Sequence, residues 1–157
     1  MPEPAKIRNV AVVGHRGTGK TSLVEALLFQ TGKINRLGTV QAGTTTSDSA
    51  DDEHERQLSI SMSLEHTTWQ DRKVNLVDVP GDPSFQGELR CAARVVEGEL
   101  VVVSAVMGVE VGTTRAWRLA DDYSVLFLAE EARVSEALWE KVVHLCSTIR
   151  SRTHHDA

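Results

Sequence analysis

The chain has 157 residues, of which 41% are hydrophobic and 25% are charged, as expected for one globular domain with a packed core. Its formal net charge of −5 argues against a protein that binds nucleic acid nonspecifically, so no DNA partner is expected. Cys91 and Cys146 show neither metal-ligand spacing nor a disulfide framework. The N-terminus lacks a signal-peptide pattern and no apolar stretch is long enough to span a bilayer, so we expect a soluble cytoplasmic protein without a membrane partner.

The first predicted element is a β-rich run at residues 7–13, and a helical pattern follows at residues 22–29. Between them, residues 14–21 read Gly-His-Arg-Gly-Thr-Gly-Lys-Thr, which fits Gly-x-x-x-x-Gly-Lys-[Ser/Thr], the phosphate-binding loop or P-loop. Gly14 ends the strand in a turn that a β-carbon would strain, and Gly19 lets backbone N–H groups close on phosphates. A strand, this loop and a helix, in that order, are the context that supports the motif.

The side chains of this loop have definite chemical roles. Lys20 brings an ammonium group to the bridge between the β- and γ-phosphates, and Thr21 offers a hydroxyl to Mg²⁺. The helix that follows directs its positive end at the same anion. The alternative is a glycine-rich turn with a surface lysine. We predict that nucleotide is bound by Gly14, His15, Arg16, Gly17, Thr18, Gly19, Lys20, Thr21 and Ser22.

A long polar segment and a hairpin come next. Residues 34–56 are rich in Gly, Thr, Ser and Asp without a period, which in a compact domain indicates a functional or a disordered loop. Residues 58–69 alternate strictly and predict a half-buried strand, followed by a hairpin turn at residues 70–72 and a strand at residues 73–77. The apolar face of the first strand is predicted to carry Leu58, Ile60, Met62 and Leu64.

Asp78 closes the second of these strands, and Val79-Pro80-Gly81 follows it. In a chain with a P-loop, an aspartate at this place is the expected carboxylate of the Mg²⁺ site. A backbone N–H of the Pro80-Gly81 turn can reach a γ-phosphate, so Asp78, Pro80 and Gly81 join the predicted nucleotide site. Taken alone, the pattern is also that of an ordinary aspartate before a turn.

The remaining elements continue the alternation of strands and helices. The sequence predicts a helix at residues 83–95, a buried parallel strand at residues 100–106 and a helix at residues 113–122. A short strand at residues 124–128 and a last helix at residues 130–150 follow. The predicted fold class is α/β, with a mostly parallel sheet, helices on both faces and the P-loop at the carboxyl ends of the strands.

Several motifs together resemble the translational GTPases, and within them elongation factor G and the elongation-factor-G-like proteins. The resemblance extends from about residue 6 to about residue 122. The motifs that carry it are the Gly14–Thr21 loop, Gly38-x-Val40-x-x-Gly43-x-Thr45-x-x-Asp48, Glu55-Arg56, Asp78-x-Pro80-Gly81, Val101-Val102-Val103-Ser104-Ala105 and Gly108-Val109-Glu110.

This resemblance implies a P-loop NTPase fold in which residues 1–157 form a single, incomplete GTP-binding (G) domain. Switch I corresponds to about residues 34–57 and switch II to about residues 79–95. The implied ligands are GTP or GDP with Mg²⁺, and the implied partner is the ribosome. Thr21, Ser59 and Asp78 are the expected metal ligands.

The chain also departs from the pattern of this family. Gly17 stands where the family usually has aspartate, and Gln57-Leu58-Ser59 stands where it has Gly-Ile-Thr. The histidine that positions the attacking water is Asp82 here. We therefore assign Lys20 and Asp82 as the catalytic residues and expect slow GTP hydrolysis, because an ionised aspartate brings like charge towards the triphosphate.

The guanine-reading motif Asn-Lys-x-Asp is missing after the strand at residues 124–128, where the chain reads Ala-Glu-Glu-Ala-Arg at residues 129–133. The last strand and helix of a full G domain are missing from the pattern as well. A weak preference for GTP over ATP is the expected consequence. The alternatives are a nucleotide-binding module or partial fragment without turnover, and a P-loop ATPase or kinase-like protein without guanine selectivity.

Overall fold

A five-stranded sheet with the strand order β2-β3-β1-β4-β5 forms the centre of the fold. The computed structural model describes residues 3–47, 53, 58–104, 106–120 and 124–129. Strand β1 pairs in parallel with β3 and β4, β5 pairs in parallel with β4, and β2 is antiparallel to β3. The strands are β1 (Ile7–Gly14), β2 (Ser63–Trp69), β3 (Arg72–Asp78), β4 (Gly98–Val103) and β5 (Ser124–Ala129).

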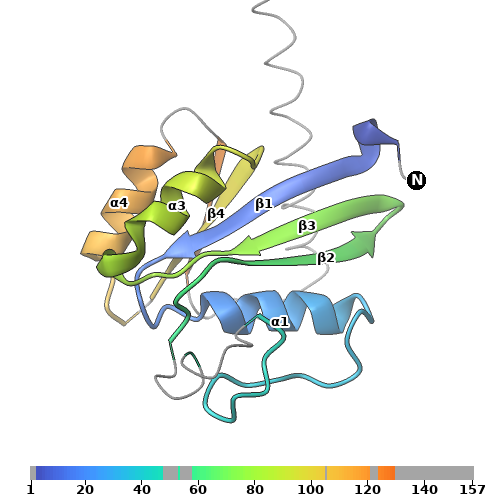
Figure 1. The fold of residues 1–157 in the computed structure, drawn as a ribbon, viewed down its shortest axis with the longest axis horizontal. Coiled ribbons are helices and arrows are strands. Elements are labelled where there is room, and N and C mark those ends of the chain that lie inside the picture. The colour runs from blue at the N-terminus through green and yellow to red at the C-terminus, as the bar shows by residue number, and fades with distance from the viewer. Residues whose placement is uncertain (1–2, 48–52, 54–57, 105, 121–123, 130–157) are drawn as a thin grey trace, which may run out of the picture.

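Helices cover both faces of this sheet (Figure 1). Helix α1 (Lys20–Gln30) lies on one face, and α3 (Gln86–Ala93) and α4 (Val111–Leu119) lie on the other. Two short 3-10 turns, η1 (Pro4–Lys6) and η2 (Pro83–Phe85), precede β1 and α3. In the part of the chain that is described, no helix is both long and apolar enough to cross a membrane. The predicted α/β fold with a mostly parallel sheet is confirmed.

Strand β1 is buried on both faces, and this fixes the position of the loop that follows it. Val10 and Val12 pack into the cluster under α1, whereas Ala11 and Val13 pack into the cluster under α3 and α4. A strand covered on both sides reads as a continuous apolar run, which is why residues 7–13 are recognisable in the sequence. The carboxyl end of β1 is therefore held rigidly between its neighbours.

The prediction for residues 58–69 is wrong about where the strand begins and about which of its two faces is buried. Strand β2 begins only at Ser63, and Leu64, predicted to be inside, is 67% exposed. The opposite face is the covered one, where Thr67 is buried and its hydroxyl donates to Thr31 Oγ1 at the end of α1. The reason is that β2 is an edge strand. Helix α1 reaches its polar face, and no described helix covers the face that carries Leu64.

The other predicted elements need smaller adjustments. The hairpin turn is confirmed, with Gln70 and Asp71 at φ 46° and 60°, and the helix predicted at residues 83–95 is split into η2 and α3. The strand predicted at residues 100–106 ends at Val103, and Val106 is 90% exposed. The predicted last helix at residues 130–150 lies outside the described residues.

Glu99 is a buried carboxyl in the middle of the sheet. It lies in β4 at 0% exposure, and neither of its oxygens has a hydrogen-bond partner among the described residues. Burial raises the pKa of Glu99 from 4.5 to about 7. The folded chain therefore retains a proton on this group that the unfolded chain releases at a lower pH.

We expect this carboxyl to make stability depend on pH. Between about pH 4.5 and pH 7 the folded state binds more protons than the unfolded state, so the free energy of unfolding falls as pH rises and levels off above pH 7. The loss is on the order of 3 kcal/mol. Glu99→Gln removes the titration and is expected to be more stable than the parent at pH 8. Urea unfolding at pH 5 and pH 8 measures this.

Glu3→Gln, at an exposed glutamate, is the matched control and should follow the parent at both pH values. A parent protein that is equally stable at pH 5 and pH 8 would show that Glu99 has an ordinary pKa.

Candidate functional site

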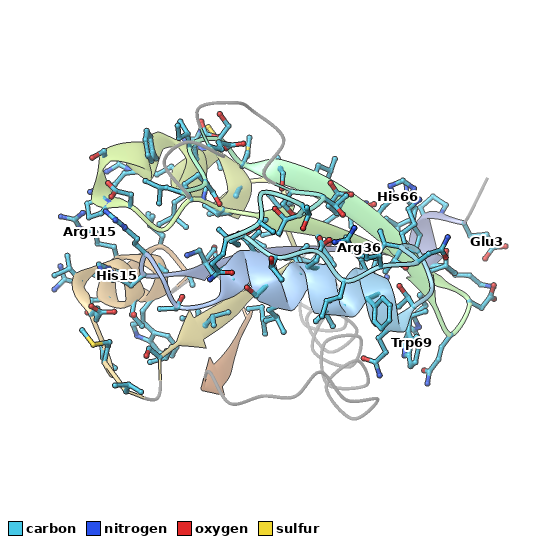
Figure 2. The ribbon with its side chains drawn as sticks, turned by 90° about the horizontal axis from the view of Figure 1, so that it is seen from below. Glu3, His15, Arg36, His66, Trp69 and Arg115 are labelled. Atoms are coloured by element: carbon cyan, nitrogen blue, oxygen red, sulfur yellow. The ribbon has the colours of Figure 1, made fainter. Side chains whose placement is uncertain are left out.

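The P-loop joins β1 to α1 at the carboxyl edge of the parallel strands (Figure 1). Strand β1 lies between β3 and β4 here, with Val12 opposite Asp78 and Gly14 opposite Val102. Figure 2 shows His15 at this end of the molecule, while Trp69 lies at the other end. The topology therefore brings the ends of three strands to one place.

Gly14 begins the loop with a backbone conformation that glycine alone adopts readily, at φ 150°. A β-carbon at this position would overlap the carbonyl oxygen of Val102 on the neighbouring strand. The close approach of β4 therefore requires glycine at the turn that the sequence predicted here.

The carbonyl oxygen of His15 organises the interior of the loop. Thr18 Oγ1 donates to it at 2.9 Å, and Lys20 Nζ donates to it at 2.8 Å. Both side chains are buried. The Lys20 ammonium is thus held against the backbone of the loop.

The three predicted metal ligands lie at this same edge. Thr21 Oγ1 and Ser59 Oγ are 3.3 Å apart, although 38 positions separate them in the sequence. Asp78 ends β3 beside β1, and its carboxylate is 2% exposed. Two hydroxyls from different segments are therefore brought together, and a buried carboxylate occupies the adjacent strand end.

The Pro80-Gly81 turn closes over the loop. A β-carbon on Gly81 would collide with Lys20 Nζ and would lie 2.7 Å from Arg16 N. The resulting pocket has a cavity volume of about 140 Å³. It is lined by Arg16, Gly17, Gly19, Lys20, Thr21, Ser22, Val40, Leu58, Ser59 and Gly81.

Asp82 does not line this pocket; it lines a smaller neighbouring cavity of about 20 Å³. Its carboxylate accepts from Ser84 N at 2.9 Å and so caps η2. Arg16 Nη1 lies 3.7 Å from Asp82 Oδ2. The Ser84 hydrogen bond is the main reason that the pKa of Asp82 is lowered, and Arg16 adds to it. Asp82 is therefore ionised at neutral pH and already has two partners.

His15 has a role that the motif does not reveal. Gly112 N, at the start of α4, donates to His15 Nδ1 at 3.2 Å, and His15 Nε2 lies 3.4 Å from Glu110 Oε1. Because Nδ1 accepts, the neutral imidazole carries its proton on Nε2 and donates towards Glu110. A β-carbon on Gly112 would lie 2.8 Å from His15 Cα, so the missing side chain permits this contact. No sequence signal links residues 97 positions apart.

Two buried glutamates hold the segments around the pocket and were also missed. Glu25 of α1 accepts from Gly38 N, Thr46 N and Thr46 Oγ1 at 3.0–3.2 Å. Glu53 Oε1 accepts from Ile60 N at 2.9 Å and from Ser61 N at 3.2 Å, next to Ser59. Glu25 lies within a predicted helix and Glu53 within a predicted loop, so neither pattern indicated a buried carboxylate.

The chain is similar to known proteins in sequence and in fold. The family described as the elongation factor Tu GTP binding domain matches residues 5–129. Elongation factor G of Petrotoga mobilis (strain DSM 10674 / SJ95) is 39% identical over 120 residues, which are 76% of this chain and 17% of that protein. The chain therefore spans about a sixth of the length of this relative.

Two solved structures are similar to the fold. A crystal structure of a protein from Thermus thermophilus matches with a TM-score of 0.77 and 36% identity, over 91% of this chain and 22% of that one. A bacterial selenocysteine-specific elongation factor, EF-Sec, matches with a TM-score of 0.63 and 21% identity, over 92% of this chain and 22% of that one, which is a likeness of fold.

We expect Glu25→Ala to release residues 38–46 from α1. Three hydrogen bonds to a buried acceptor are lost, and unsatisfied donors cost about 1–3 kcal/mol, so the free energy of unfolding should fall by about that amount. Limited proteolysis within residues 34–47 should become faster. Gln30→Ala, at an exposed position of the same helix, is the control. Equal cleavage rates in Glu25→Ala and the parent would show that Glu25 does not anchor this segment.

Proposed function

This chain belongs to the elongation factor Tu GTP-binding domain family, and we propose that residues 14–22, Ser59, Asp78, Pro80 and Gly81 form its nucleotide and Mg²⁺ site. The chain is a GTP-binding domain of the kind found in translational GTPases. We further propose that residues 1–157 are a single, incomplete G domain, with switch I at about residues 34–57 and switch II at about residues 79–95.

One observation carries the proposal for the site. Lys20, Thr21, Ser59 and Gly81 come from three separate segments and line a single pocket at the start of α1. The backbone N–H groups at a helix start and a buried ammonium are suited to polyphosphate. Lys20 would leave the His15 carbonyl for the phosphates, which offer it negatively charged oxygens.

Mg²⁺ fits the residues present at this edge. The ion prefers oxygen ligands and shares them with substrate phosphates and water. Thr21 and Ser59 supply two hydroxyl oxygens 3.3 Å apart, and Asp78 supplies a buried carboxylate on the adjacent strand. When bound, Mg²⁺ neutralises charge on the phosphates. Across the described residues no cluster of three or more His, Cys, Asp or Glu forms another metal site.

The chemistry proposed is slow attack of water on the γ-phosphate of GTP. Lys20 would stabilise charge on the phosphoryl oxygens, and the backbone N–H of Gly81 would orient the terminal phosphate. Asp82 lines a cavity beside the pocket, and its ionised carboxylate can accept from water but cannot donate. This supports binding with weak turnover, and a nucleotide-binding module without turnover is the alternative.

We assign no whole-protein activity to this chain, because the part that matches the elongation factor G relative is 17% of that protein. We propose the ribosome as the macromolecular partner and the cytoplasm as the location, because elongation factor G is a translation factor. Residues 130–157 lie outside the described structure, and their sequence contains no Asn-Lys-x-Asp, which favours weak discrimination between GTP and ATP.

Calorimetric titration with GTP, GDP and ATP, with and without Mg²⁺, tests the site. We expect Lys20→Ala to weaken binding of each nucleotide by roughly ten- to a hundredfold, because a charge-assisted hydrogen bond is worth about 1.5–3 kcal/mol. Lys33→Ala, at an exposed lysine beyond the end of α1, is the control. If Lys20→Ala binds as tightly as the parent, the loop is not the phosphate site.

A second experiment concerns turnover. We expect Asp82→His to raise the single-turnover rate of GTP hydrolysis by at least about tenfold, because a positioned histidine can donate to water or phosphate where aspartate cannot. Phosphate release from a stoichiometric GTP complex measures the rate. Asp82→Asn separates removal of the charge from introduction of the imidazole. An unchanged rate in Asp82→His with intact GTP binding would mean that position 82 does not limit hydrolysis.

A further inference from the structure

We infer that the Arg16 guanidinium is a ligand of the terminal phosphate of a nucleoside triphosphate, and that Asp82 holds it when that phosphate is absent. This inference rests on the proposed nucleotide site. It assigns to a variable position of the P-loop a contact that a nucleoside diphosphate cannot make. In this inference Asp82 has a second role besides capping η2, which is to bind Arg16 in the absence of the terminal phosphate.

The position of Arg16 supports this assignment. Arg16 lines the same pocket as Lys20 and Thr21, and its Nη1 atom lies 3.7 Å from Asp82 Oδ2. Its backbone nitrogen is next to Gly81, where a β-carbon would lie 2.7 Å away. Arg16 is thus placed where the P-loop and the turn after β3 meet, on the side of the pocket from which Gly81 would approach a terminal phosphate.

The ion pair between Arg16 and Asp82 is easily exchanged. The Arg16 side chain is 62% exposed and its contact with Asp82 is longer than a hydrogen bond. Exposed pairs of this kind contribute little to stability. A phosphate carries more charge than a carboxylate and matches the fork of a guanidinium, so it competes well for Arg16.

The Asp82 carboxylate remains hydrogen-bonded when Arg16 moves away from it. Its carboxylate keeps the hydrogen bond from Ser84 N at 2.9 Å, and that bond is the main cause of its lowered pKa. Arg115 of α4 lines the same small cavity as Asp82, and its Nη1 is buried without a hydrogen-bond partner among the described residues. Figure 2 shows Arg115 at the end of the molecule where His15 lies.

The exchange would make the turn after β3 sensitive to the terminal phosphate. With a diphosphate, Arg16 links the P-loop to Asp82. With a triphosphate, Arg16 binds the additional phosphate and releases Asp82, and η2 is no longer tied to the loop.

Calorimetric titration of the full chain in Mg²⁺ tests this, with GDP and with a GTP analogue whose β,γ-bridge is an imido group. We expect Arg16→Ala to weaken binding of the analogue by about tenfold and binding of GDP by less than about threefold, because a charged contact to one phosphate is lost. Asp82→Asn should tighten binding of the analogue about threefold, since competition for Arg16 and like charge are removed. The double variant should show coupling between the two positions with the analogue and none with GDP.

Arg90→Ala, at an exposed arginine of α3, is the matched control, and Arg16→Lys should recover part of the affinity for the analogue. Thermal unfolding establishes that each variant is folded, and Arg16→Gln replaces Arg16→Ala if the latter is not. Equal weakening of both nucleotides by Arg16→Ala, or no weakening, overturns the inference. A parent chain that binds neither nucleotide overturns the proposed function instead.

Discussion

The contact between Gly14 and the Val102 carbonyl is the constraint on which the rest of the site depends. The two residues are paired across β1 and β4, and a β-carbon at position 14 would force the strands apart. With Gly14 in place, the chain turns sharply at the edge of a rigid sheet. The His15 carbonyl then lies where Thr18 and Lys20 can both donate to it. The shape of the loop is therefore set by backbone approach and by its own hydrogen bonds.

Buried acidic side chains divide into those that organise the site and one that does not. Glu25 and Glu53 accept backbone N–H groups from segments that contribute to the pocket, and the Glu53 contacts are to the two residues that follow Ser59. A buried carboxylate is stabilised when several donors surround it. Glu99 has no such donors among the described residues, and burial raises its pKa instead. In the described part of the sheet, the buried Glu99 carboxyl is thus without hydrogen-bond donors, whereas Glu25 and Glu53 near the pocket are hydrogen-bonded.

One departure from the elongation factor G pattern falls where a γ-phosphate and its attacking water are proposed to lie. The P-loop motif itself, including Lys20 and Thr21, is retained. Asp82 replaces the usual histidine, and it lies beside Arg16 in the P-loop. Nucleotide binding and hydrolysis use different parts of such a site. A chain can therefore retain nucleotide binding while its hydrolysis rate is altered.

The sequence by itself determined the P-loop, the buried strands and the α/β order of elements, because each depends on local rules. Glycine at a strained turn, apolar runs in strands covered on both faces and the Gln70-Asp71 hairpin are all encoded within a few residues. The same local rules put Leu64 inside, and this was wrong. A strict alternation shows that a strand has two faces, but which face is covered depends on the helices that pack on it and on the place of the strand at the sheet edge.

Tertiary structure alone decided the contacts that complete the site. Thr21 contacts Ser59, which is 38 positions away in the sequence. His15 contacts Gly112, 97 positions away, and Arg16 pairs with Asp82, 66 positions away. Resemblance to a family suggested the first of these pairs, and no pattern in the chain suggested the other two. The physical reason is that periodicity and turn chemistry act over a few residues, whereas these side chains come together because parallel strands deliver their carboxyl ends to one edge of the sheet.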